Sequence, residues 1–145
     1  MKKLVVWDCD DTLWHGTIMY GDDLVLKHGV KEILETLHNR GVVQSIASTN
    51  IKDDVLQKLE QFGISSYFLV PHADLETPKS GMVKSIKDIL GIARFKDIVF
   101  VDDQVFNRCE VEDSCEGVYS CQSEDMLGVI EKFFTKKEAI SREYY

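Results

Sequence analysis

The residues with the clearest chemical potential form the run Asp8-Cys9-Asp10-Asp11-Thr12, which directly follows an apolar segment. An Asp side chain has an ordinary pKa of about 3.9 and is ionised at neutral pH, so it can serve as a nucleophile and as a hard oxygen ligand. Two carboxylates about 4 Å apart repel by roughly 4 kcal/mol at an effective dielectric constant near 20. A cluster of these groups at a strand end therefore predicts a site for a metal ion and a phosphate.

Other polar residues also follow apolar segments or begin the helix after one: Ser48-Thr49-Asn50, Lys79 and Asp102-Asp103. Function in a parallel sheet sits at the carboxyl ends of the strands, so we expect these side chains to meet the first run. Magnesium is the expected cofactor, because it takes oxygen ligands and bridges carboxylates to phosphate. The candidate metal ligands are Asp8, Asp10, Asp102 and Asp103.

The other candidates suit a phosphorylated small-molecule substrate. Ser48, Thr49 and Asn50 are candidates to bind phosphoryl oxygens by hydrogen bonds. Lys79 is a candidate to neutralise the charge on those oxygens. The set describes phosphoryl transfer through an aspartyl phosphate. A structural interpretation stays open, because the same hydroxyl and amide groups would suit the cap of a helix that starts near residue 51.

The elements that must position these residues follow one rhythm, in which a short apolar strand precedes an amphipathic helix. The strands are expected at residues 4–7, 42–47, 67–70, 98–101 and 117–120, and the helices at 30–39, 51–61, 82–90, 105–111 and 126–134. Strands that are apolar throughout suit a sheet covered on both faces. The fold class expected is α/β, with a three-layer, doubly wound (Rossmann-like) parallel sheet of about five strands.

One segment breaks the rhythm. Residues 14–27 contain two short apolar runs, at 17–20 and 24–27, around a polar turn, and this pattern predicts a β-hairpin flap. We expect a single domain over residues 1–135 and a polar C-terminal tail over 136–145. The intervals between the candidate residues leave no room for a cap domain, so the flap would be the only lid.

Composition limits the remaining possibilities. The 145 residues carry a formal net charge of −8, which argues against a nucleic-acid partner because that would need a basic face. No apolar stretch is long enough to span a bilayer, so we expect no membrane partner. The four cysteines show no spacing typical of zinc sites, and reduced thiols in a cytoplasmic protein are the expected state.

The ordered set of motifs resembles the haloacid dehalogenase superfamily across almost the whole chain. The resemblance rests on Asp8-x-Asp10-x-Thr12, Ser48, Lys79 and the apolar run that ends in Asp102-Asp103. It implies that Asp8 attacks phosphorus and that Asp10 acts as general acid and then as general base. It also implies that magnesium is held by Asp8, the main-chain carbonyl of Asp10 and Asp102, with Asp103 as a ligand or water-mediated partner.

A narrower resemblance, to the FkbH-like branch, rests on the stretches at residues 7–17, 44–48, 67–71 and 100–104. It implies a glyceryl transferase/phosphatase that takes a phosphoglyceryl unit from bisphosphoglycerate, dephosphorylates it and loads it on an acyl carrier protein. Cys9 would then be catalytic and carry the unit as a thioester. The alternative for Cys9 is a small buried residue, because in a continuing strand it points away from Asp8 and Asp10.

Three other functions remain as alternatives. The small capless magnesium-dependent phosphatases of the same superfamily, which act on phosphomonoesters, match the chain in length and motif order. A response-regulator receiver would carry its phosphoacceptor at the end of the third strand, whereas that strand is expected to end in Leu69-Val70-Pro71. A catalytically silent interaction domain would have lost one of the motif residues, and none is missing.

Overall fold

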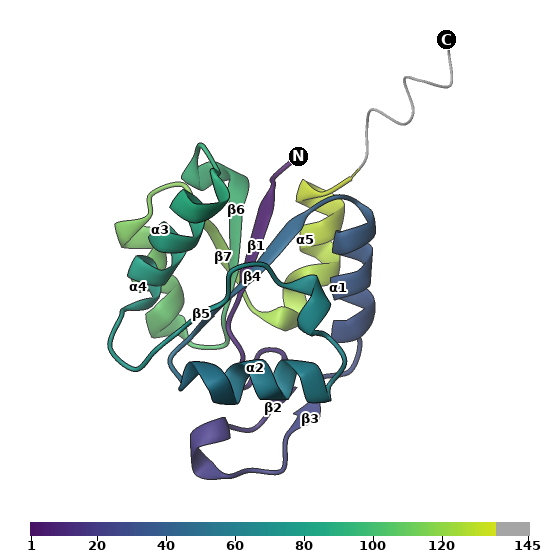
Figure 1. The fold of residues 1–145 in the computed structure, drawn as a ribbon. Helices are drawn as coiled ribbons and strands as arrows, with labels where there is room; N and C mark the ends of the chain where they lie inside the picture. The colour runs from purple at the N-terminus through teal and green to yellow at the C-terminus, as the bar shows by residue number, and fades with distance from the viewer. Residues whose placement is uncertain (136–145) are drawn as a thin grey trace.

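Five parallel strands form the central sheet of the computed structural model, which describes residues 1–135 (Figure 1). In spatial order they are β5 (His72–Ala73), β4 (Val43–Ser48), β1 (Leu4–Trp7), β6 (Ile98–Val101) and β7 (Tyr119–Cys121). Numbered by their place in the chain, the strands lie in the Rossmann-like order 3-2-1-4-5. The expected fold class is confirmed. The expected tail over 136–145 lies outside the described residues.

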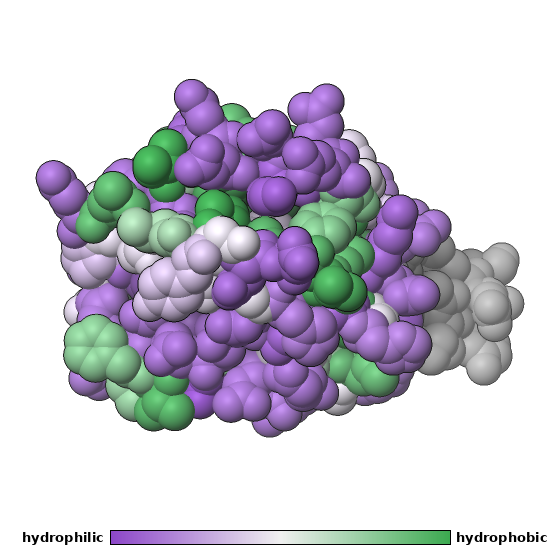
Figure 2. Space-filling model, turned by 90° about the horizontal axis from the view of Figure 1, so that it is seen from below, coloured by the Kyte–Doolittle hydropathy of each residue, from purple (hydrophilic) through white to green (hydrophobic). Residues whose placement is uncertain are grey.

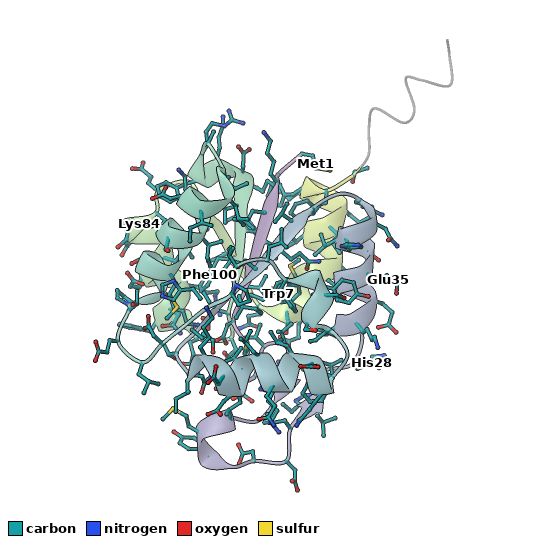
Figure 3. The ribbon with its side chains drawn as sticks, viewed as in Figure 1. Met1, Trp7, His28, Glu35, Lys84 and Phe100 are labelled. Atoms are coloured by element: carbon teal, nitrogen blue, oxygen red, sulfur yellow. The ribbon has the colours of Figure 1, made fainter. Side chains whose placement is uncertain are left out.

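Helices cover both faces of the sheet. They are α1 (Val30–Asn39) and α5 (Met126–Phe133) on one face, α3 (Lys79–Leu90) and α4 (Val105–Ser114) on the other, and α2 (Lys52–Gln61) near the carboxyl ends of the strands (Figure 1). Two hydrophobic clusters fill the spaces between these layers. Trp7 belongs to the cluster on the α1 side and Phe100 to the cluster on the α3 side (Figure 3).

Strand β1 is buried on both faces, and its side chains alternate between the two clusters. Val5 and Trp7 pack on the α1 side, whereas Leu4 and Val6 pack on the α3 side. Cys9 continues this alternation and lies in the same cluster as Trp7. The period of two therefore extends past the last residue of the strand, which separates Cys9 from its two Asp neighbours.

A buried amide joins three elements of the α1 side. The Trp7 indole N–H donates to Gln44 Oε1 over 2.9 Å, and Gln44 Nε2 donates to the main-chain oxygen of Leu34 over 3.0 Å. Gln44 is 1% exposed, so both of its polar atoms depend on protein partners. This contact fixes β1, β4 and α1 relative to one another.

The hairpin forms, but its first strand is not at residues 17–20. The paired strands are β2 (Trp14–His15) and β3 (Val25–Leu26), and a 3-10 turn occupies Ile18–Tyr20. The main-chain N–H of Thr17 donates to Asp22 Oδ2 and that of Ile18 to Asp10 Oδ1. These carboxylates take the amides that a longer β-ladder would need.

The expectation of a third strand at residues 67–70 is wrong. Phe68 forms only an isolated bridge to Gln44, and β5 begins later, at His72. Val70 has φ of 44°, a left-handed backbone that ends the pairing, and Pro71 has no N–H to donate to β4. The apolar run therefore contains a turn where a continuous strand was expected.

Two helix boundaries differ from the sequence patterns by three residues, and two others differ by one. Helix α3 begins at Lys79, ahead of the periodic segment expected from residue 82, and α4 continues to Ser114, beyond the expected end at residue 111.

Within residues 1–135, no helix combines the length and apolar character that a membrane crossing requires.

We expect the substitution Gln44→Leu to lower the free energy of unfolding by about 1–3 kcal/mol, because it leaves the buried Trp7 indole N–H without an acceptor. Urea unfolding measures the change. The matched background is Trp7→Phe. There, Gln44→Leu should lower the free energy of unfolding by less, because no indole N–H is left without an acceptor. An equal cost in both backgrounds would contradict this account of the contact.

Candidate active site

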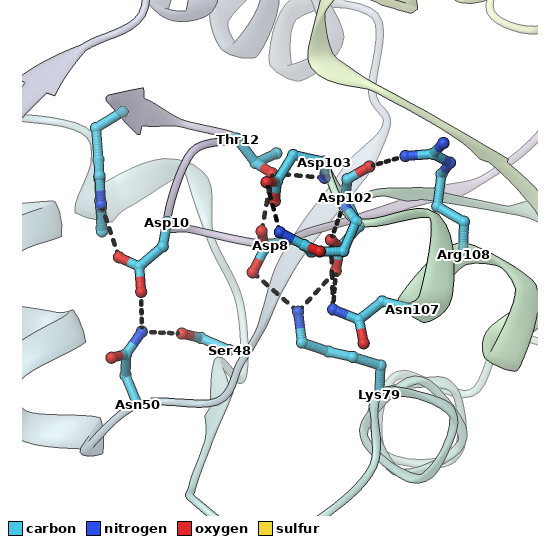
Figure 4. Close-up of polar contacts among 12 residues, drawn as sticks. Asp8, Asp10, Thr12, Ser48, Asn50, Lys79, Asp102, Asp103, Asn107 and Arg108 are labelled. Carbon is cyan, nitrogen blue, oxygen red and sulfur yellow. Dashed lines mark hydrogen bonds and ion pairs between the residues drawn. The ribbon is translucent and has the colours of Figure 1, made fainter. Parts of the chain in front are cut away.

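Lys79 lies between two carboxylates that come from neighbouring strands (Figure 4). Its Nζ is 2.8 Å from Asp8 Oδ1, at the end of β1, and 2.8 Å from Asp102 Oδ2, at the end of β6. The Lys79 residue is 2% exposed and Asp102 is fully buried. The first residue of α3 therefore bridges the carboxyl ends of two adjacent parallel strands, and the structure brings these three expected site residues together.

A third carboxylate, that of Asp103, completes a compact acidic cluster. Thr12 connects it to the first strand, because Thr12 Oγ1 donates to Asp8 Oδ2 over 2.8 Å and accepts from the Asp103 main-chain N–H over 3.1 Å. One carboxylate oxygen from each of Asp8, Asp102 and Asp103 lies within 4.8 Å of the other two. Three hard oxygen donors at this spacing fit a divalent cation such as Mg²⁺.

The charges in this cluster are poorly balanced. Burial raises the pKa of Asp8 to about 8, and the Asp102 charge acts in the same direction against the opposing effect of Lys79. Burial alone would lower the pKa of Lys79, but its two carboxylate partners outweigh this effect and raise it. One ammonium group thus faces three carboxylates, and the excess negative charge gives a divalent cation a physical reason to bind.

Asp10 lies outside the acidic cluster and is held by different donors. Its Oδ1 accepts hydrogen bonds from Trp14 Nε1 over 3.0 Å and from the main-chain N–H of Ile18 over 3.1 Å. Its Oδ2 accepts from Asn50 Nδ2 over 2.8 Å. The Asp10 side chain is thus committed to the flap and to Asn50, so a metal-binding role would fall to its main-chain carbonyl.

The second strand end contributes a buried pair to the same region. Ser48 is fully buried, Asn50 is 2% exposed, and Asn50 Nδ2 donates to Ser48 Oγ over 2.9 Å. Thr49, between them, is exposed. The three expected phosphate-binding residues are therefore not equivalent, because Ser48 and Asn50 join the Asp10 group whereas Thr49 lies at the surface.

The loop that connects β1 to the flap has a constrained backbone. Asp11 has φ of 57° and Gly16 has φ of 98°, and the Gly16 main-chain N–H donates to Asp11 Oδ1 over 2.8 Å. A Cβ at Gly16 would come within 3.0 Å of side-chain atoms of Asp22 and Leu24. Asp11 thus closes the loop and is not part of the acidic cluster.

Comparison with known proteins assigns the chain to a family. The family of haloacid dehalogenase-like hydrolases matches residues 20–108, which is more than half of the chain. The chain belongs to this family. No curated protein matches it.

Several solved structures have a similar fold. The N-terminal part of a Bacteroides fragilis protein, which contains a phosphatase domain and is complexed with Mg, has a TM-score of 0.78 at 25% identity; the match covers 93% of this chain but 41% of that one. A superfamily hydrolase from Ehrlichia chaffeensis has a TM-score of 0.75 at 14% identity, over 93% and 100% of the two chains. A hydrolase from Streptococcus pneumoniae has a TM-score of 0.72 at 15% identity, over 90% and 98%.

Cys9 of this haloacid dehalogenase-like hydrolase is fully buried in the cluster around Trp7. Burial raises the pKa of its thiol well above the ordinary value, and the nearby charges of Asp8 and Asp10 act in the same direction. A neutral, buried thiol is a poor nucleophile. The environment is typical of a packing residue.

Three side chains that sequence reasoning gave no role also support the candidate active site. Thr12 joins two of the carboxylates, Asn107 Nδ2 donates to Asp102 Oδ2 over 3.2 Å, and an Arg108 guanidinium N–H donates to the main-chain oxygen of Asp102 over 2.8 Å. The sequence signal for Asn107 and Arg108 was their place on the first turn of the helix that follows Asp102-Asp103. Such a turn brings its side chains back towards the preceding strand end.

The face of the molecule that carries the flap and α2 is mainly hydrophilic, with separate hydrophobic patches (Figure 2). The flap itself exposes three large apolar side chains, with exposed fractions of 60% for Met19, 82% for Tyr20 and 61% for Val25. The flap therefore joins a half-buried attachment at Asp10 to an exposed apolar tip.

We expect the melting temperature of the metal-free protein to fall as the pH rises from about 5 to about 8. The pKa of Asp8 is about 8 in the folded state and about 3.9 when unfolded, so the folded state alone keeps this proton, and its stabilising effect is lost as the pH rises. Mg²⁺ should raise the melting temperature by an increment that grows over the same range. Differential scanning calorimetry measures both effects.

The matched control is Asp8→Asn, which cannot ionise and keeps a similar shape. Subtracting its pH profile from that of the wild type isolates the contribution of Asp8. A wild-type profile that runs parallel to that of Asp8→Asn between pH 5 and 8, without metal, would contradict the raised pKa.

Proposed function

We propose that this protein is a magnesium-dependent phosphatase that hydrolyses phosphomonoesters through an aspartyl-phosphate intermediate. The observation that carries the proposal is the division of the site into two groups. Asp8, Lys79 and the Asp102-Asp103 pair form an acidic cluster with one ammonium group, whereas Asp10 is held separately by Asn50 and the flap. A nucleophile and an acid–base group need this separation, because their chemical states must differ.

The family assignment and one structural relative support the proposal. Membership in the haloacid dehalogenase-like hydrolases gives hydrolysis as the reaction class. The Bacteroides fragilis structure contains a phosphatase domain and Mg, at 25% identity, but this chain spans 41% of that chain. We infer the same class of reaction here, and we do not extend the inference to the rest of that protein.

In the first step of the proposed reaction, a carboxylate oxygen of Asp8 forms a bond to phosphorus while the bond from phosphorus to the leaving oxygen breaks. Asp10 gives its proton to that leaving oxygen, which departs as an alcohol. Lys79 and the Ser48 hydroxyl are suited to contact the phosphoryl oxygens. Mg²⁺, when held by Asp8, Asp102, Asp103 and the main-chain carbonyl of Asp10, would supply positive charge against the phosphoryl group.

In the second step, water attacks the phosphorus of the aspartyl phosphate. The Asp10 carboxylate takes a proton from this water, and the bond between phosphorus and the Asp8 oxygen breaks. Inorganic phosphate leaves, Asp8 returns as a carboxylate and Asp10 is again protonated. Both residues therefore regain their starting states after each turnover.

Glyceryl transfer to an acyl carrier protein is the second candidate function. It is favoured by the place of Cys9 in the Asp8-Cys9-Asp10 motif and by the Ser48 hydroxyl, which acts to lower the pKa of the Cys9 thiol. Burial outweighs that effect, and Cys9 has no exposed surface. A thioester at Cys9 would require the end of β1 to open, so we place phosphomonoester hydrolysis first.

The phosphatase proposal predicts Mg²⁺-dependent release of phosphate from a broad panel of small phosphomonoesters. Asp8→Asn should lower kcat by at least about a thousandfold, because it removes the nucleophile. The fold should remain intact, since Asn has a similar shape, retains an acceptor for Thr12 and leaves Asp102 as the partner of Lys79. A phosphate-release assay and circular dichroism test the two parts. Absence of wild-type turnover on the whole panel in the presence of Mg²⁺ would overturn the proposal.

The role of Cys9 is tested separately. Cys9→Ala should keep phosphatase activity within about threefold of wild type, because the thiol only packs in the core. Intact-mass spectrometry after incubation with a bisphosphoglycerate-generating system, with and without an acyl carrier protein, should show no glyceryl or phosphoglyceryl adduct on the wild type. An adduct that is present on the wild type and absent from Cys9→Ala would establish the glyceryl-transfer function instead.

A further inference from the structure

Asn50 donates both of its amide hydrogens to two other residues of the site (Figure 4). Its Nδ2 is 2.8 Å from Asp10 Oδ2 and 2.9 Å from Ser48 Oγ. A side-chain amide nitrogen carries two hydrogens, so none remains for a phosphoryl oxygen. The geometry therefore conflicts with the phosphate-binding role that the sequence suggested for Asn50.

The orientation of this amide is well determined by its surroundings. When Asp10 is ionised, the reverse orientation would place Asn50 Oδ1 against its carboxylate, where two acceptors would repel. In the orientation found, Oδ1 is buried and has no hydrogen-bond partner among residues 1–135. An unsatisfied buried acceptor such as Oδ1 is destabilising, and the two hydrogen bonds that Nδ2 donates offset this cost.

The donors around Asp10 distinguish its two oxygens. Each carboxylate oxygen offers about two lone-pair sites. Both sites on Oδ1 are taken, by Trp14 and by the main chain of Ile18. Among residues 1–135, Oδ2 accepts only from Asn50 and keeps one site free. Oδ2, the oxygen that Asn50 holds in place, is therefore the Asp10 atom with an open site for a proton.

The same amide also sets the direction of the Ser48 hydroxyl. Because Ser48 Oγ accepts from Asn50, its own proton must be donated to some other group. The Ser48 hydroxyl is fully buried and acts on the Cys9 thiol, so a phosphoryl oxygen at the end of β4 would have to replace Cys9 as the acceptor of this proton. The Asn50 amide nitrogen thus lies between Asp10, the proposed proton donor, and Ser48, the proposed phosphate-binding residue.

We propose that Asn50 is a positioning residue that aligns the proton-bearing oxygen of Asp10 with the phosphate held at Ser48. This inference rests on the proposed phosphatase function and adds a role for Asn50 in proton delivery. Its removal should impair protonation of the leaving oxygen more than binding of the phosphate, because Ser48 and Lys79 remain. The sensitivity of the enzyme to the leaving group should therefore rise.

The experiment compares kcat/KM for two substrates in wild type, Asn50→Ala and Asn50→Asp. An alkyl phosphate needs a proton on its leaving oxygen, whereas para-nitrophenyl phosphate releases a stable anion and needs little acid assistance. We expect Asn50→Ala to lower kcat/KM about 100-fold for the alkyl phosphate and less than about 10-fold for the aryl phosphate. Asn50→Asp, which sets a carboxylate against Asp10, should show the same pattern.

The ratio of the two kcat/KM values is independent of the folded fraction, so partial misfolding of one variant does not imitate the result. Lys52→Ala, an exposed change on the first turn of α2, is the matched control and should leave the ratio unchanged. Equal losses for both substrates, or a change confined to KM, would overturn the positioning role. If the wild type turns over neither the alkyl phosphate nor the aryl phosphate, the proposed function and this inference are overturned together.

Discussion

The burial of one ammonium group is the constraint on which the site depends. Lys79 is almost completely excluded from solvent and contacts Asp8 and Asp102 at the same distance of 2.8 Å. An unpaired buried charge costs several kcal/mol by effective estimates, so neither strand end can move away from the start of α3 without a large penalty. The parallel pairing of β1 with β6 brings the two carboxylates together, and Lys79 makes their proximity tolerable. Within residues 1–135, the third carboxylate, that of Asp103, has no ammonium partner, which leaves the cluster suited to a cation.

The second half of the site is organised around hydrogen bonds in place of ion pairs. Asp10 joins the flap, through Trp14 and Ile18, to Asn50 beside the end of β4. Trp14 is itself fully buried and stacks on Phe62 with ring centroids 5.6 Å apart, so one anchor of Asp10 is part of the hydrophobic core. The flap is therefore attached to the acid–base group and to the core at once. A change in flap position would therefore alter the hydrogen bonds that Trp14 and Ile18 donate to the Asp10 carboxylate.

The sequence was most informative where a pattern was local. The continuous apolar run at residues 4–7 predicted β1, and the helix expected over 30–39 was found at those residues. It was least informative where side chains compete with the backbone for hydrogen bonds. The carboxylates of Asp10 and Asp22 take flap amides, and the left-handed turn at Val70 interrupts an apolar run that reads as a strand. Neither effect has a periodic signature, because each depends on one contact or one backbone angle.

The sequence by itself determined the types of chemical group present and the order in which strands deliver them to one edge of the sheet. Tertiary structure decided how those groups divide. The pairing of β1 with β6 places Asp8 beside Asp102, whereas the flap and Asn50 draw Asp10 away. Cys9, between the two in the chain, turns into the core because side chains alternate along an extended backbone. Adjacent residues in one motif thus reach three different environments, and only the packing of distant segments around them sets each one's charge and partners.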